Sequence, residues 1–281
     1  METRILVVDE SGAKGLAKTL GPDENEIGVM AGIVCTISEM DYLNKEMGEI
    51  IKSFKSEDIS KFHITDLTSD NQEKLRHVTF ELIKTMNIKW FYDAIFSHGF
   101  HKSEYDKHRC VRPDPNKSLH SQLFCNMFMM GLFITKKQIH GTDINLIVKT
   151  DNIDRGVINK IKKDLSSCVD ILTGKKLRFI KNRPANCNIP DLELIIDFSF
   201  NKHKTPYFNK IIYDICCELT PITVLADVLA NSTLHYLKEY ANLGGEQLNN
   251  KKAISKHPLV DLVFPINEGD RISEIDVLYR K

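Results

Sequence analysis

The sequence predicts an α/β fold in which helices flank one mixed central sheet. Short apolar runs rich in β-branched residues alternate along the chain with longer segments of helical periodicity. Strands that are interspersed with helices are typical of a central sheet whose faces are covered by helices. The 281 residues are 42% hydrophobic, which is enough for one large core. We therefore expect one domain over residues 1–281, and the only subdivision considered is a helical lobe inserted at about residues 98–140.

Each expected strand is a short apolar run. Residues 4–9 (RILVVD) form a continuous apolar run that predicts a strand buried on both faces. Turn-forming residues bound the other runs. The further strands are expected at residues 27–37, 88–97, 143–150, 177–181 and 192–200.

The expected helices have apolar residues at helical spacing and recognisable start signals. Thr220 and Pro221 are typical of an N-cap and a first helical residue. Loops are expected at 12–26 and 98–117, where glycine, proline and polar residues accumulate. The helices are expected at residues 41–54, 69–86, 118–139, 154–169 and 220–240.

The composition narrows the class of protein. The formal net charge is zero, whereas a sequence-independent nucleic-acid binder usually carries a basic excess, so any nucleic-acid contact must use local patches. Each patch is equally compatible with a solvated charged face. The two patches are Lys175, Lys176, Arg178, Lys181 and Arg183, and His101, Lys102, Lys107, His108, Arg109 and Arg112.

Cysteine usage and hydropathy predict the compartment. The seven cysteines are scattered without a secretory framework, which indicates free thiols in a reducing compartment. We see no signal peptide at the N-terminus and no apolar stretch near the roughly 20 residues that span a bilayer. The expected location is the cytoplasm, without a membrane contact.

Two aspartates occupy positions that ask for an explanation. Asp9 ends the apolar run 5–8, and ligand sites in open α/β sheets form beyond strand ends. It could equally cap the turn that follows. Asp227 lies within the apolar run 224–230 of an expected helix, where a lone buried carboxylate is costly. It needs either a structural hydrogen bond or a cation.

A third carboxylate and a histidine complete the candidate set. Asp151 follows the expected strand 143–150, although a helix N-cap is an alternative that fits Asp154 better. His63 stands in a polar turn and could act as a general base or acid, or simply lie at the surface. Carboxylate oxygens suit Mg²⁺ or Mn²⁺, and two such ions can promote an in-line displacement at phosphorus. We expect Asp9, Asp151 and Asp227 to be the metal ligands.

Three short motifs in this order resemble a known family. They are VVDESG at 7–12, KFH at 61–63 and ITVLADVLA at 222–230. Together they resemble the domain-of-unknown-function family 3800, which is placed among RNase H-like folds. The resemblance implies an RNase H-like sheet with Asp9 as the first-strand acid and Asp227 as the late-helix acid. Glu10 and His63 match family positions of less defined role, and the family's Leu-Gln before the ADxxA segment is replaced here.

The residues and the resemblance favour a metal-dependent nuclease, or a related phosphodiester-cleaving enzyme, that acts on nucleic acid. The alternative is a catalytically silent RNase H-like binding or assembly module that works with a partner protein, for instance in mobile-element or antiphage defence. Met127, Met129 and Met130 could belong to a partner surface or to the core. A zinc site built from His98, His101, His108 and Cys110 is a third alternative, although its spacing fits no common pattern.

Overall fold

A computed structural model describes most of the chain. The described residues are 1–13, 26–54, 62–102, 115–139, 141–174, 177–181, 192–196, 207–264 and 273–279. The strands are β1 (Glu2–Gly12), β2 (Ile27–Cys35), β3 (Trp90–Phe96), β4 (Asp143–Thr150), β5 (Leu177–Lys181), β6 (Leu192–Ile196) and β7 (Lys210–Cys217). The α-helices are α1 (Ile37–Phe54), α2 (Ser69–Thr85), α3 (Ser97–Lys102), α5 (Pro115–Gln138), α6 (Arg155–Leu172), α7 (Pro221–Asn242) and α8 (Glu274–Leu278). Two short 3-10 helices are η2 (Ile64–Asp66) and η3 (Val260–Leu262).

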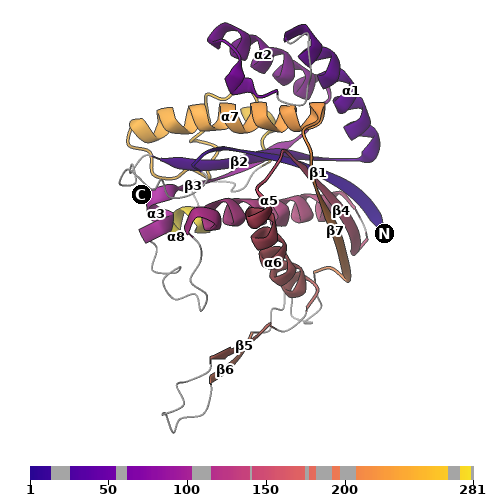
Figure 1. Ribbon diagram of the computed structural model, residues 1–281, viewed down its shortest axis with the longest axis vertical. Helices are drawn as coiled ribbons and strands as arrows, with labels where there is room; N and C mark the ends of the chain where they lie inside the picture. Colours follow the sequence, from indigo (N-terminus) through magenta and orange to yellow (C-terminus); the bar gives the residue numbers. More distant parts are fainter. Residues whose placement is uncertain are drawn as a thin grey trace.

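Five strands form the central sheet in the order β3-β2-β1-β4-β7 (Figure 1). β2 is antiparallel to β1 and β3, whereas β4 is parallel to β1 and β7. The predicted fold class, a mixed α/β sheet flanked by helices, is therefore confirmed, and the arrangement is consistent with an RNase H-like fold. Because β1, β3, β4 and β7 run in the same direction, their carboxyl ends meet at one edge of the sheet, which is called the acidic edge below.

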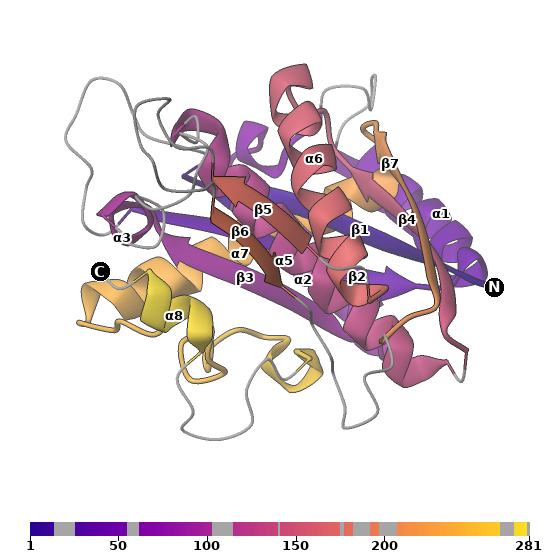
Figure 2. The ribbon, with the colours of Figure 1, turned by 90° about the horizontal axis from the view of Figure 1, so that it is seen from below.

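Helices cover both faces of this sheet. α7, with α1 and α2 outside it, lies on one face, and α5 with α6 lies on the other (Figures 1 and 2). Side chains alternate between the two cores along β1: Ile5 and Val7 pack with α7, whereas Leu6 and Val8 pack with α5. By the same alternation, Asp9 faces α7 and Glu10 faces α5.

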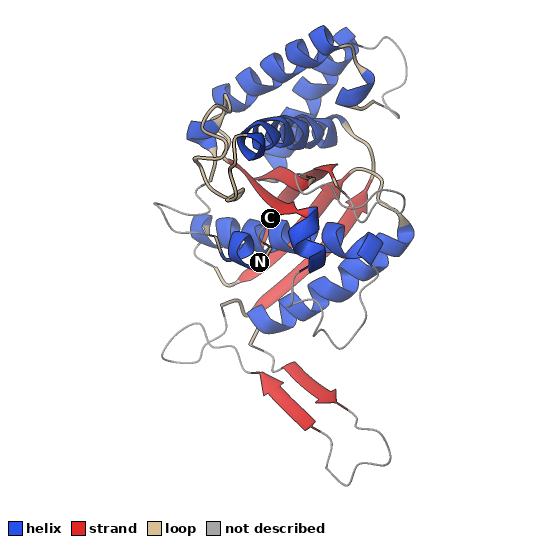
Figure 3. Cartoon of the chain, turned by 90° about the vertical axis from the view of Figure 1, so that its left-hand side faces the viewer, coloured by secondary structure: helices blue, strands red, loops and turns tan. Residues whose placement is uncertain are grey.

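Three segments differ from the sequence prediction: β7, the pair β5 and β6, and the expected loop 98–117. The fifth strand, β7, was not predicted, although residues 211, 213 and 215 carry an alternating apolar pattern. The strands β5 and β6 were predicted, but they pair only with each other in a separate two-stranded sheet (Figure 3). Of the expected loop 98–117, residues up to 102 belong to α3 and those from 115 belong to α5.

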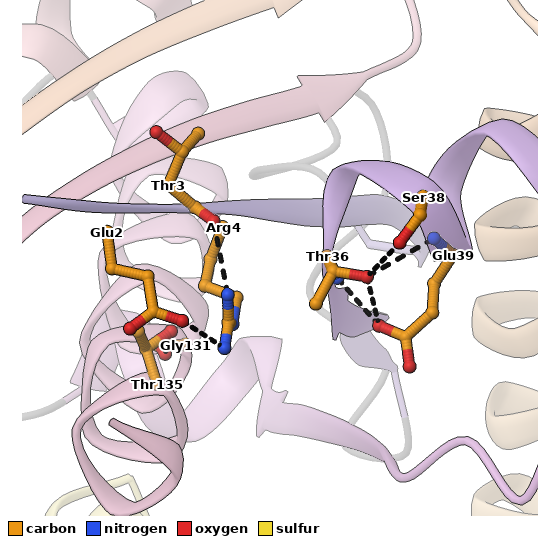
Figure 4. A network of polar contacts seen from close by, with 8 residues as sticks. All are labelled: Glu2, Thr3, Arg4, Thr36, Ser38, Glu39, Gly131 and Thr135. Carbon is orange, nitrogen blue, oxygen red and sulfur yellow. Dashed lines mark hydrogen bonds and ion pairs between the residues drawn. The ribbon is translucent and has the colours of Figure 1, made fainter. Parts of the chain in front are cut away.

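The start of α1 also differs, because the helix begins at Ile37 rather than near residue 41. A capping box explains this early start (Figure 4). The Thr36 backbone N–H donates to Glu39 Oε2 at 2.7 Å, and the Glu39 backbone N–H donates to Thr36 Oγ1 at 3.2 Å. Nearby, the Arg4 guanidinium pairs with Glu2 on β1. The box ends β2 at Cys35, two residues earlier than predicted.

β3 is an edge strand of the sheet, and the later part of the chain covers the side of β3 that faces away from β2. The Asn249 side chain makes the two hydrogen bonds that the backbone of a neighbouring strand would make. Its Oδ1 accepts from the Ala94 N–H at 2.8 Å, and its Nδ2 donates to the Ala94 carbonyl at 2.7 Å. Further along the same edge, the Phe264 N–H donates to the Trp90 carbonyl at 2.7 Å. These contacts protect an edge strand that would otherwise present free backbone groups.

The described helices include none that is both long enough and apolar enough to cross a membrane. The methionines of α5 lie against the core: Met127 is fully buried, and Met129 and Met130 are partly buried. The expected lobe at 98–140 contributes α5, whose buried side chains pack on β1, β2 and β3. The single-domain boundaries stay a prediction.

Candidate functional site

The ends of β1 and β4 bring two of the predicted acids to the acidic edge. Val7 pairs with Lys149, so Asp9 and Asp151 lie two residues beyond this pair on adjacent parallel strands. Asp9 is 6% exposed, and its Oδ1 accepts the Glu10 backbone N–H at 2.9 Å. The chain turns away only at Gly12, where φ is +82° and an added Cβ would overlap the Ile27 carbonyl oxygen. β1 is therefore long enough to place Asp9 at the acidic edge.

Asp227 reaches the same edge from α7. This helix is buried along almost its whole length, and Asp227 itself is only 9% exposed. Asp227 Oδ2 accepts the backbone N–H of Ile64 at 2.9 Å. The predicted structural hydrogen bond therefore exists, and it fixes the short turn that carries His63 against α7.

His63 lies between two of the acids. Its Nε2 is 3.7 Å from Asp151 Oδ2, and its Nδ1 is 3.9 Å from Asp227 Oδ2. The His63 side chain is 45% exposed, so the imidazole faces both solvent and the carboxylates. A histidine in this position is reachable by a bound substrate and is also oriented by its neighbours.

Asp151 and Asp154 play different structural parts. Asp154 is the N-cap of α6, because its Oδ1 accepts the backbone N–H of Gly156 at 2.8 Å and that of Val157. The Asp151 carboxylate instead accepts the N–H of the next residue, Asn152. The predicted capping role therefore belongs to Asp154, which leaves Asp151 directed toward His63.

The pKa values show that the acids act on one another. Burial, the largest cause, raises the pKa of Asp9 well above its ordinary value, and the charges of Glu10 and Asp227 raise it further. Burial also raises the pKa of Asp227. The Ile64 N–H and His63 lower it in part, and Asp151 and Glu10 raise it again. All five predicted site residues therefore belong to one electrostatically connected group, the acidic cluster, formed by Asp9, Glu10, His63, Asp151 and Asp227.

His120 is a neighbour of this cluster that the sequence did not predict. It lies on α5, where it is buried, and its Nε2 is 3.8 Å from Glu10 Oε2. Its sequence context gave no signal, because polar residues surround it: Lys117, Ser118, Ser121 and Gln122. Glu10 thus faces α5 and His120, while Asp9 faces α7 and Asp227.

The carboxylate oxygens of the acidic cluster are ligands that hard cations prefer, although the described side chains do not form a complete metal site. Within the described ranges, no three histidine, cysteine or carboxylate side chains are grouped closely enough to hold a metal ion. Carboxylates whose pKa values are raised by burial, and further by neighbouring acids, are stabilised in their charged form by a positive charge. Mg²⁺ typically takes one or two protein carboxylates, and waters and substrate phosphate complete its shell. Asp9 and Asp227 fit that requirement.

Two other predicted features fall largely outside the described residues. Of the zinc alternative, His98 is buried at the start of α3, but residues 108 and 110 are not described. Both basic patches lie mostly in ranges that the structure does not describe, and Lys102 is an exposed member of the second patch. No contact of these patches enters the argument for the site.

Comparison with known proteins adds no relative. No protein-family model matches the chain, and the search of curated proteins gives no match. The resemblance to the domain-of-unknown-function family 3800 therefore stays a prediction that rests on the three motifs.

Proposed function

We propose that this protein is a divalent-metal-dependent nuclease that hydrolyses phosphodiester bonds in the cytoplasm. The observation that carries the proposal is the convergence of Asp9, Glu10, His63, Asp151 and Asp227 at one edge of the sheet. These residues come from β1, α7, the β4 end and the η2 turn, so local sequence does not bring them together. Nucleic acid as the substrate is supported by the motif resemblance and the form of the sheet.

Asp9, Asp151 and Asp227 would hold Mg²⁺ or Mn²⁺. When bound, the ion supplies Lewis-acid stabilisation for the charge that develops on the phosphate. The chain's own part is to place these carboxylates at one largely buried edge, where an electrostatic interaction is stronger than in water. Burial at this edge is unfavourable for the charged forms of Asp9 and Asp227, and their pKa values are raised accordingly.

His63 has a separate task in this proposal. Its two ring nitrogens face Asp151 and Asp227, which orient the ring, and nearly half of its side chain is open to a substrate. An imidazole placed in this way can accept or deliver a proton at Nε2 during cleavage. Removal of His63 should therefore lower turnover more than metal binding.

The test is cleavage of single- and double-stranded DNA, RNA and an RNA–DNA hybrid with Mg²⁺ or Mn²⁺. Asp9→Asn and Asp227→Asn preserve shape and should each lower turnover by about 100-fold or more. Asp214→Asn is the matched control, because Asp214 is an exposed aspartate on the edge strand β7. Full cleavage by both site variants would refute the assignment.

A binding or assembly module is the outcome to set against this one. It predicts no cleavage of any of the four substrates and no heat of binding for Mg²⁺ or Mn²⁺ in calorimetry. Met127 is a core residue, so the methionines of α5 offer less of a partner surface than their sequence pattern allows. Asp227 would keep its structural hydrogen bond to Ile64 in such a module, but the gathering of the other acids around it would have no role, which is why the nuclease is preferred.

A further inference from the structure

A buried contact on the α5 side of the acidic edge connects His120 with Glu10. His120 Nε2 lies 3.8 Å from Glu10 Oε2, and only 6% of the His120 side chain and 11% of the Glu10 side chain are exposed. Bulk salt screens a partly buried pair much less than a surface pair. The contact is therefore sheltered from solvent, unlike exposed ion pairs of this protein such as Lys52–Glu49 and Lys84–Glu81.

The position of His120 is fixed by close packing of the helix on the sheet. A Cβ added at Gly28 of β2 would lie 3.2 Å from methyl carbons of both Leu119 and Leu123, and 2.7 Å from the Ala13 carbonyl oxygen. α5 thus lies directly on β2 where the strand has no side chain. Because Leu119 is held there, the adjacent His120 is held at the end of β1 as well.

Glu10 needs such a neighbour because it stands beside another acid. Its charge raises the pKa of Asp9, and a hydrogen bond between the two carboxyl groups raises it further, so the two groups repel only when both are ionised. An unrestrained glutamate has three rotatable side-chain bonds and would relieve the repulsion by turning toward water. The buried imidazole of His120, which approaches Glu10 from α5, opposes that movement.

We infer that His120 is a positioning residue that holds the Glu10 carboxylate at the acidic cluster, facing the phosphodiester that is to be cleaved. The inference rests on the proposed nuclease function, and it assigns His120 no contact with the substrate. The inferred route from His120 to the reaction passes through Glu10, which gives the inference a specific signature in a double-mutant cycle.

The kinetic experiment uses the full chain with Mn²⁺ and a cleavable nucleic acid. His120→Leu should lower kcat by about 20-fold and leave KM nearly unchanged, because a misplaced catalytic group affects the chemical step. His120→Gln retains an N–H at similar reach and should restore most of the activity. Thr135→Val is the control on the same helix: Thr135 is buried, but its hydroxyl binds the Gly131 carbonyl far from the cluster.

The decisive comparison repeats His120→Leu in a Glu10→Gln background. If His120 acts through Glu10, the second substitution should change kcat by less than about twofold. An equal loss in both backgrounds would overturn the inference, as would full activity of His120→Leu.

A spectroscopic measurement separates this inference from the proposed function. In a long-range ¹H–¹⁵N spectrum, Glu10→Gln should shift the His120 Nε2 resonance. The same change should leave the resonances of His257, a buried histidine hydrogen-bonded to Ser232, in place. If the wild-type chain cleaves nothing, the nuclease proposal fails, and this spectrum still decides the contact. An unshifted His120 resonance overturns the inference.

Discussion

Replacement of Asp93 by asparagine is expected to remove a pH dependence that this buried carboxyl imposes on stability. Asp93 lies on β3, and burial raises its pKa to about 7, although hydrogen bonds from Asn126 and Ala94 lower it in part. Asn126 Nδ2 donates to Asp93 Oδ2 at 2.7 Å. Asparagine can accept the same hydrogen bond through its carbonyl oxygen, so the variant keeps the contact and loses only the ionisable group.

The direction and size of the change in stability with pH follow from the raised pKa of Asp93. The pKa of Asp93 in the folded chain is raised above the ordinary value of 3.8. Its stabilising contribution is therefore complete below about pH 3.8 and is lost as the pH rises through 7. Between pH 5 and pH 8, this loss lowers the free energy of unfolding by about 2.5 kcal/mol.

The wild-type curve alone does not isolate this effect, because Asp9 and Asp227, whose pKa values are also raised, add to it and His257 opposes it. Burial lowers the pKa of His257 from 6.5 to about 3, so its contribution is complete above pH 6.5 and is lost as the pH falls toward 3. From pH 8 to pH 5, that loss is about 2 kcal/mol. These other contributions are the same in both proteins, so they drop out when Asp93→Asn is compared with wild type.

The assay is urea unfolding of wild type and Asp93→Asn at pH 5, 6, 7 and 8. The variant should gain about 2.5 kcal/mol relative to wild type between pH 5 and pH 8. Asp214→Asn, at an exposed site, should show no such gain. A difference between Asp93→Asn and wild type that stays constant within about 0.5 kcal/mol over this range would refute the reasoning.

Three further predictions concern the sheet edge, the sheet interior and the cluster. Asn249→Ala leaves the Ala94 N–H and carbonyl without their partner, which should cost about 2–4 kcal/mol in urea unfolding and speed hydrogen exchange at Ala94. Gly32→Ala places a Cβ 2.0 Å from the Val7 carbonyl oxygen, so it should cost about 3 kcal/mol by the same measurement, and an unchanged midpoint would contradict the packing. Mn²⁺ at about 100 times its Kd should stabilise wild type by about 2.7 kcal/mol, and a chelator should reverse this; Asp9→Asn should show no gain.

The strand-end acids could be predicted from the sequence because their signal is local. An apolar run of four residues followed by aspartate correctly indicates a strand, but β1 continues to Gly12, so Asp9 is its last buried residue and not its end. Asp227 was recognisable for a different reason, since a carboxylate inside an apolar helix conflicts with its surroundings. In both cases the sequence signal lay within a single segment of the chain.

The features that were missed depend on pairs of segments. β7 has a weak alternating pattern, and it is fixed as a strand mainly by parallel pairing with β4. His120 gains a role only because α5 lies over β2 at Gly28 and thereby meets the end of β1. The early start of α1 is an exception, because the Thr36–Glu39 capping box is a local signal that an expected strand end at residue 37 obscured.

The two interpretations of Asp227, structural hydrogen bond and metal ligand, are compatible with each other. The contacts of Asp227 in the described residues go to Oδ2, which accepts from Ile64 and faces His63. A carboxylate has acceptor sites on both oxygens, so a cation can use Oδ1 while Oδ2 holds the turn. The structural bond then has a functional consequence, because it orients the carboxylate and fixes His63 before any ion arrives. An Asp227→Asn variant that stays folded but loses turnover would separate the two parts, since the amide oxygen can still accept from Ile64.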